Sequence, residues 1–167
     1  MKHLLTILEI DHVRNGEVIW QAENLKNVLH TQGEEYMLTA LFKTTVADIP
    51  TFYYLGLDNR TTPDASDAFP TALQDEPTTN GYSRQAVSSA TGFVIEEVDG
   101  ITRATSLIVS FAASGGSWGP IRNLFLTDKI NDTGYLIATA PLGSTRTLQD
   151  GDFITMKFAL ALKDVPA

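Results

Sequence analysis

Residues 4–20 read LLTILEIDHVRNGEVIW, and they contain the clearest structural signal in the chain. Two stretches rich in β-forming residues flank the pair Asn15-Gly16. Asn-Gly between two such stretches is the strongest short-range signal for a β-hairpin, because both residues tolerate the positive φ angles of a tight turn. The sequence therefore predicts an N-terminal hairpin over about residues 3–22.

Further β-rich stretches follow, separated by turn residues such as Asp99-Gly100 and Asp150-Gly151-Asp152. No strand–helix alternation occurs, which excludes a Rossmann-type sheet. Regularly spaced short strands are typical of an antiparallel β-sandwich, so we expect a mainly β, jelly-roll-like sandwich that forms one domain over residues 1–167. The expected strands after the hairpin cover residues 51–57, 82–87, 93–98, 102–111, 121–127, 135–140 and 153–162.

One segment has the periodicity of a helix. Tyr36 or Met37, Ala40 and Leu41 recur at a spacing of three to four residues. Two glutamates precede them, at the end where the helix dipole favours negative charge. The sequence predicts a short helix over residues 33–44 that packs on the sheet with Met37, Leu41 and Tyr36 facing inward.

The composition excludes several classes of protein. The 167 residues carry a formal net charge of −8 and no cysteine. An acidic chain is repelled by phosphate backbones, and a chain without cysteine has no disulfides or thiolate sites. No stretch of about 18 apolar residues occurs, and the apolar start of the chain stops at Glu9, too early for a secretion signal. We expect synthesis in the cytoplasm and no nucleic-acid or membrane partner.

Residues 58–79 contain three prolines and five acidic residues, and they predict a loop. A loop of about twenty residues within a compact domain is uncommon and usually serves binding or assembly. Asp58, Asp64 and Asp67 are the candidate calcium ligands, but the Gly and Glu positions of a calcium loop are not matched. We therefore favour a solvated acidic loop and expect no metal and no cofactor.

No catalytic motif stands out. His3, His12 and His30 lack the spacing of metal ligands, and isolated histidines are most often surface or half-buried side chains. Ser117 lies in Gly-Ser-Trp-Gly, which lacks the Gly-x-Ser-x-Gly spacing of a nucleophile elbow. We interpret Trp118 as an indole that plugs one end of the sandwich. The sequence indicates a protein that is not an enzyme.

A series of short motifs extends over about residues 20–160. They are Trp20 before a helix opened by Gly33-Glu34, then Tyr54-Leu55-Gly56-Leu57, Gly81-Tyr82-Ser83-Arg84, Trp118-Gly119, Asn123-Leu124-Phe125-Leu126, Gly134-Tyr135-Leu136-Ile137 and Gly151-Asp152. In this order they resemble small structural proteins of tailed bacteriophages, which are described as head decoration, tail or virion proteins. The resemblance implies a virion component whose partners are the major capsid protein or tail proteins and further copies of itself.

Three hypotheses about function follow from the resemblance and the composition. The leading one is a capsid decoration or cement protein bound to the outside of the head. The alternative is a tail, collar or fibre component with possible host-glycan binding. The third is a stand-alone carbohydrate-binding module or a hydrolase. An Asp or Glu that is required for turnover would establish the hydrolase.

In a virion, the N-terminal hairpin and the 58–79 loop are the expected contact elements. A sandwich closes its own core and leaves its loops and edge strands free to dock on neighbours. The candidate assembly contacts are Asn15, Gly16, Asp58, Arg60, Pro63, Asp67, Phe69, Pro70 and Asp75.

Overall fold

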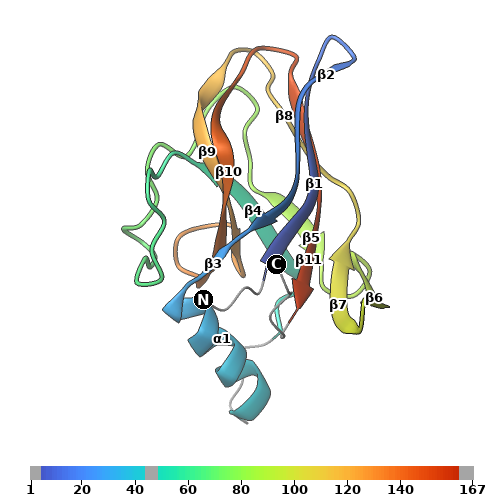
Figure 1. The fold of residues 1–167 in the computed structure, drawn as a ribbon. Helices are drawn as coiled ribbons and strands as arrows, with labels where there is room; N and C mark the ends of the chain where they lie inside the picture. The colour runs from blue at the N-terminus through green and yellow to red at the C-terminus, as the bar shows by residue number, and fades with distance from the viewer. Residues whose placement is uncertain (1–4, 44–48, 162–167) are drawn as a thin grey trace.

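The computed structural model describes residues 5–43 and 49–161, and these residues form eleven strands and one helix. The elements are β1 (Leu5–Arg14), β2 (Glu17–Lys26), β3 (Val28–Leu29), α1 (Thr31–Phe42), β4 (Phe52–Asp58), β5 (Gln85–Ser88), β6 (Phe93–Val98), β7 (Ile101–Ser106), β8 (Val109–Ala112), β9 (Trp118–Thr127), β10 (Leu136–Leu148) and β11 (Phe153–Ala161). The strands build two antiparallel sheets that face each other, with α1 projecting from one end (Figure 1). The predicted mainly β sandwich is confirmed.

The first sheet has the order β2-β1-β11-β7-β6, with β8 also paired to β11, and the second has the order β3-β10-β9-β4-β5. Large apolar side chains from both sheets are fully buried between them, and each contributes about 1.5–3 kcal/mol relative to an exposed position. This core includes Ile7, Ile10, Phe111, Ile154 and Phe158 from the first sheet and Leu55, Leu57, Leu124 and Leu148 from the second. Trp118 is also buried in the core, as expected.

The predicted N-terminal hairpin is confirmed by β1 and β2. Asn15 and Gly16 have φ angles of 52° and 82°, which is the geometry that favours this residue pair in a tight turn. The turn is exposed and lies at the opposite end of the sandwich from α1 (Figure 1). The second strand continues to Lys26, beyond the predicted end.

The helix begins two residues earlier than predicted, directly after His30, whose extended backbone still pairs with β10. Tyr36 is buried and Met37 packs against the core, as expected. Leu41 is 66% exposed, so the prediction that it faces inward is wrong. It lies in the last turn of α1, the helix that projects from one end of the sandwich (Figure 1). Residue 44, the predicted end of the helix, lies outside the described residues.

The strand predicted over 102–111 is two strands, β7 and β8. Both strands pair with β11. Between the two paired stretches, the chain that runs from β7 to β8 has one more residue than β11 has. This irregularity interrupts the alternation and leaves Leu107 and Ile108 more than half exposed. No helix in the part of the chain that the structure describes is long and apolar enough to cross a bilayer.

Strand β10 is much longer than the predicted strand over residues 135–140. Between Pro141 and Arg146, β10 advances five residues while its partner β9 advances two. The extra residues form a large bulge, and Gly143 within it has a φ of +74°. Proline and glycine are usual signs that a strand has ended, so the second half of β10 was not predicted. Strand β9 likewise begins three residues before its predicted start.

Candidate interaction surface

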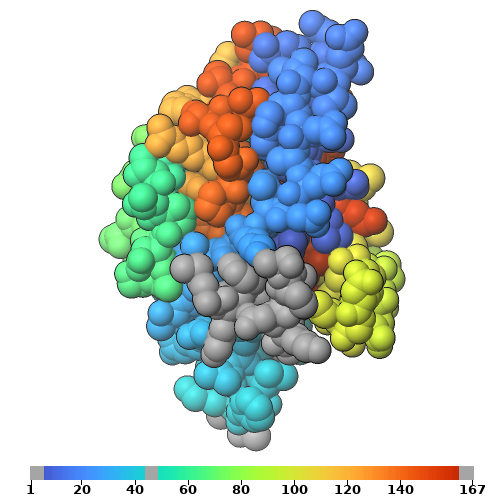
Figure 2. Space-filling model, viewed as in Figure 1, coloured from blue at the N-terminus to red at the C-terminus, as the bar shows by residue number. Residues whose placement is uncertain are grey.

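The segment between β4 and β5, residues 59–84, lies across the outer face of the second sheet, beside β9 and β10 (Figure 2). We call it the covering segment. Its Phe69 is buried against Phe125 and Leu136 in a second, smaller apolar cluster. The two phenylalanine rings meet edge to face, with centroids 6.1 Å apart. The segment is longer than the predicted loop, and Phe69 packs it on the sheet, while Asp64 and Asp75 remain exposed.

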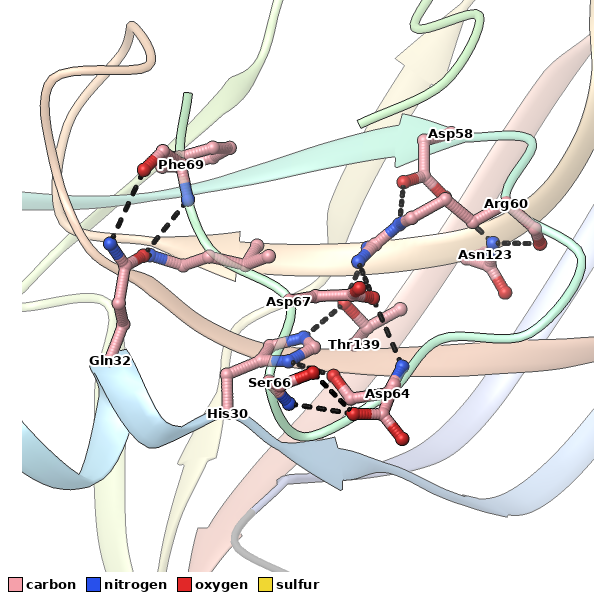
Figure 3. Close-up of polar contacts among 11 residues, drawn as sticks. His30, Gln32, Asp58, Arg60, Asp64, Ser66, Asp67, Phe69, Asn123 and Thr139 are labelled. Carbon is pink, nitrogen blue, oxygen red and sulfur yellow. Dashed lines mark hydrogen bonds and ion pairs between the residues drawn. The ribbon is translucent and has the colours of Figure 1, made fainter. Parts of the chain in front are cut away.

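A buried network around Arg60 fixes the start of the covering segment (Figure 3). Arg60 forms an ion pair with Asp58, and it donates to Asp67 Oδ2 and Thr139 Oγ1, both at 2.7 Å. Asn123 donates to Asp58 Oδ1 and to the Arg60 carbonyl, both at 2.7 Å. Burial raises the pKa of Asp58, against the opposing effect of Arg60. Because a buried charge is tolerated only with its partners in place, the network holds the segment in this one position.

His30 joins the covering segment to the helix and to the second sheet (Figure 3). The ring is fully buried, with Nδ1 2.8 Å from the Asp64 carbonyl oxygen and Nε2 2.8 Å from Thr139 Oγ1. The carbonyl only accepts, so Nδ1 carries the proton and Nε2 accepts from the threonine hydroxyl. Burial, helped by the nearby charge of Arg60, lowers the pKa of His30 to about 4. The ring is therefore neutral at pH 7.

Gln32 holds the middle of the covering segment. Its Oε1 accepts from the backbone N–H of Phe69 at 3.1 Å and from that of Leu136 at 2.9 Å. One side chain on the first turn of α1 thus bridges the segment and β10 (Figure 3).

Arg84, the last residue of the covering segment, fixes its end. Its Nη2 donates to Glu76 Oε2 at 2.7 Å and also forms an ion pair with Asp132. The guanidinium lies over the rings of Phe69 and Phe125 and covers the outer apolar cluster. The segment is therefore fastened at its beginning, middle and end.

This arrangement corrects part of the predicted assembly surface. Asp58, Arg60 and Phe69 are 0%, 4% and 8% exposed, so they hold the segment to its own sheet and are not available to neighbours. The other candidates, Asn15, Gly16, Pro63, Asp67, Pro70 and Asp75, are exposed or half-buried.

The candidate calcium ligands already have partners within the chain. Asp58 and Asp67 both pair with Arg60, and Asp64 accepts from the backbone and hydroxyl of Ser66. The expectation of a solvated carboxylate is wrong for Asp58, which is fully buried. Within residues 5–43 and 49–161, no three His, Cys, Asp or Glu side chains are grouped as a metal site requires.

A second buried network joins β1 to the turn before β11. Asp152 accepts from Arg14 Nε and from His12 Nε2, both at 2.9 Å. Its hydrogen bonds from the Arg14 guanidinium hold the pKa of Asp152 well below its ordinary range. The interpretation of Asp152 as only a turn residue is too narrow.

The expectation of surface or half-buried histidines is wrong for His12 and His30, while His3 lies outside the described residues.

Exposed apolar side chains occur in α1 and in the chain just before and at the start of β4. They are Leu38 (60% exposed), Leu41 (66%), Phe42 (78%), Ile49 (67%) and Phe52 (41%), and we call this group the apolar end. The hydroxyls of Tyr36 and Tyr53 lie 3.0 Å apart and tie α1 to the start of β4. α1 and the start of β4 are therefore neighbours, and the exposed apolar side chains on them are a candidate surface for contact with other proteins. Sequence reasoning missed this surface because it placed Leu41 in the core.

Comparison with known proteins gives a match over most of the chain. Residues 28–161 match the model of a family described as Podophage GP4 fiber I protein gp80. The match begins at β3 and ends with β11, so it includes the covering segment and the apolar end but not the N-terminal hairpin. Among curated proteins, none matches the chain.

Proposed function

We propose that this chain, which belongs to the family described as Podophage GP4 fiber I protein gp80, is a fibre component of a tailed-phage virion. Membership identifies a structural protein of a tailed-phage virion, as the sequence motifs imply. The family description names a fibre protein, so it favours the fibre alternative over the leading hypothesis of a capsid decoration protein. That description is the observation that carries the proposal.

The fold supports a structural role. The covering segment is held by buried ion pairs and hydrogen bonds, so the second sheet carries a firmly packed layer on its outer face. The apolar end offers a surface that neighbouring proteins can cover. We propose that the apolar end packs against other virion proteins or further copies of this chain.

We also propose that the chain has no catalytic role. Both ring nitrogens of His30 and one of His12 are used in buried hydrogen bonds that hold segments of the fold together. A histidine that acts as a general base needs a ring nitrogen within reach of a substrate proton. These two histidines are better suited to stabilising the sandwich.

Copy number distinguishes a fibre from a capsid decoration protein. The test is quantitative mass spectrometry of purified virions, with the major capsid protein in the same digest as the internal standard. A fibre component is expected at tens of copies per particle or fewer. Hundreds of copies, in a fixed ratio to the capsid protein, would overturn the fibre assignment in favour of capsid decoration.

A further inference from the structure

The bulge in β10 opens a polar recess on the outer side of the second sheet. The recess has a volume of about 250 Å³ and lies between the bulge, the neighbouring part of β9 and the start of the covering segment. Bulges commonly occur beside functional sites because they redirect side chains that a regular ladder would align. The lining residues that matter here are Thr61, Arg122, Asn123, Pro141, Ser144 and Thr145.

Arg122 differs from every other arginine in the chain. The remaining five each have a carboxylate or aromatic partner: Arg14 with Asp152, Arg60 with Asp58, Arg84 with Glu76, Arg103 with Glu96, and Arg146 over the ring of Trp20. Arg122 forms no ion pair within the described residues, and its buried Nε has no hydrogen-bond partner there. A cation without a carboxylate partner in the described residues, in a chain of net charge −8, is free to bind an anionic group from outside the chain.

The groups around Arg122 both donate and accept hydrogen bonds. Ser144 Oγ is buried and lacks a partner among the described residues, and the hydroxyls of Thr61 and Thr145 also line the recess. Asn123 donates through its amide nitrogen to Asp58 and to a backbone carbonyl, which leaves the amide oxygen as an acceptor. The recess thus combines a cation, three hydroxyls and an acceptor.

We infer that this recess binds an acidic saccharide, with a sugar carboxylate on the guanidinium of Arg122. The planar guanidinium matches a carboxylate through two parallel hydrogen bonds. Sugar hydroxyls both donate and accept, so they pair with Ser144 and with the oxygen of Asn123, while Pro141 offers an apolar surface to the C–H face of a ring. An ionised phosphate or an acidic side chain accepts from the cation and the hydroxyls but leaves the amide oxygen of Asn123 without a donor.

This inference goes beyond the fibre role and depends on it only for where the site is displayed. The test is an NMR titration of the purified full chain. The acidic saccharides are trigalacturonate, sialyllactose and a glucuronate oligomer, and the comparison ligands are the methyl ester of trigalacturonate, inorganic phosphate and an aspartate-containing peptide. At least one acidic saccharide is expected to shift the resonances of Arg122 and Ser144. Esterification of a bound uronate, or Arg122→Gln, should weaken binding at least tenfold.

Matched variants separate binding from folding. Arg103 and its partner Glu96 both lie on the first sheet, whereas the recess lies on the second. Arg103→Gln should therefore leave saccharide affinity unchanged. Ser144→Ala removes only the unpaired hydroxyl and should weaken binding several-fold without lowering the melting temperature.

Three results would overturn the inference: no binding by any acidic saccharide, unchanged binding by the Arg122→Gln variant, or equally tight binding of phosphate or the peptide. Copy number in the virion tests the fibre assignment separately, so the two proposals can fail independently.

Discussion

The guanidinium of Arg84 lies over the ring of Phe125, with its Cζ 4.9 Å from the ring centroid. The same guanidinium lies 5.2 Å from the ring centroid of Phe69 and pairs with Glu76. A desolvated cation–π contact contributes about 2 kcal/mol. The last residue of the covering segment therefore covers the apolar cluster that its middle residues form with the sheet.

Replacing Arg84 with alanine should lower the free energy of unfolding by about 3 kcal/mol, because Glu76 loses its partner and two rings lose their cover. Urea denaturation measures the loss, and limited proteolysis should cut the covering segment faster than in the unmodified chain. Arg103→Ala breaks the more exposed pair with Glu96 and should cost under about 1 kcal/mol. Equal losses in the two variants would show that Arg84 does not fasten the segment.

Gly56 on β4 lies directly beneath the ring of Phe125. A Cβ at position 56 would lie 2.2 Å from Phe125 Cζ, so Gly56→Ala must displace the ring and should destabilise the chain by about 2 kcal/mol. Gly100→Ala is the control, because a Cβ there meets no atom within 4 Å and only the positive φ adds a cost of about 1 kcal/mol. Thermal unfolding compares the two, and a Gly56→Ala variant more stable than the control would contradict this packing.

Stability should depend on pH through His30. In the unfolded chain a histidine titrates near pH 6.5, whereas the pKa of His30 in the fold is lowered to about 4. Between these values the unfolded state binds a proton that the folded state does not, so the free energy of unfolding falls as the pH falls from about 6.5 to about 4, by about 3 kcal/mol in total. Urea titrations at several pH values measure the slope.

The matched variant for this pH effect is His30→Gln. It should be less stable at pH 7, because it loses a hydrogen bond to Asp64 or Thr139, and it should lack the His30 contribution to the slope. The assignment fails if the variant retains the slope of the unmodified chain.

The apolar end should be required for assembly and not for folding. Leu41→Glu combined with Phe42→Glu places charges on exposed side chains in the last turn of α1, so stability should fall by only about 1 kcal/mol, the cost of negative charge at a helix C-terminus. Incorporation into virions, measured by immunoblot of purified particles, should be lost. Leu107→Glu with Ile108→Glu is the control, since it changes another exposed apolar pair, which lies between β7 and β8. Normal incorporation of the first variant would exclude the apolar end as a contact.

Signals that act over a few residues were readable from the sequence. The pair Asn15-Gly16 sets its own backbone geometry, so the hairpin was predicted. The bulge in β10 depends on the register with β9, and Pro141 and Gly143 gave the misleading impression of a strand end. Local pattern therefore recovered the sandwich but not the shape of this sheet.

The candidate site was harder to predict because its residues are far apart in sequence. Arg60 looked like a surface residue in an acidic loop, and its burial depends on Asn123 and Thr139, which other strands supply. Nothing in the sequence near Arg122 signals a binding residue, and its lack of a partner is visible only in the folded chain. The helix periodicity was read correctly for Tyr36 but not for Leu41, because the sheet ends before the helix does.

The fibre assignment is tested most directly by locating the chain in the particle. An epitope inserted between Asp99 and Gly100 lies in the exposed turn that joins β6 to β7, and neither residue is among the candidate contacts. Electron microscopy of antibody-labelled virions should then show the label on fibres. Label spread evenly over the faces of the capsid would contradict the assignment.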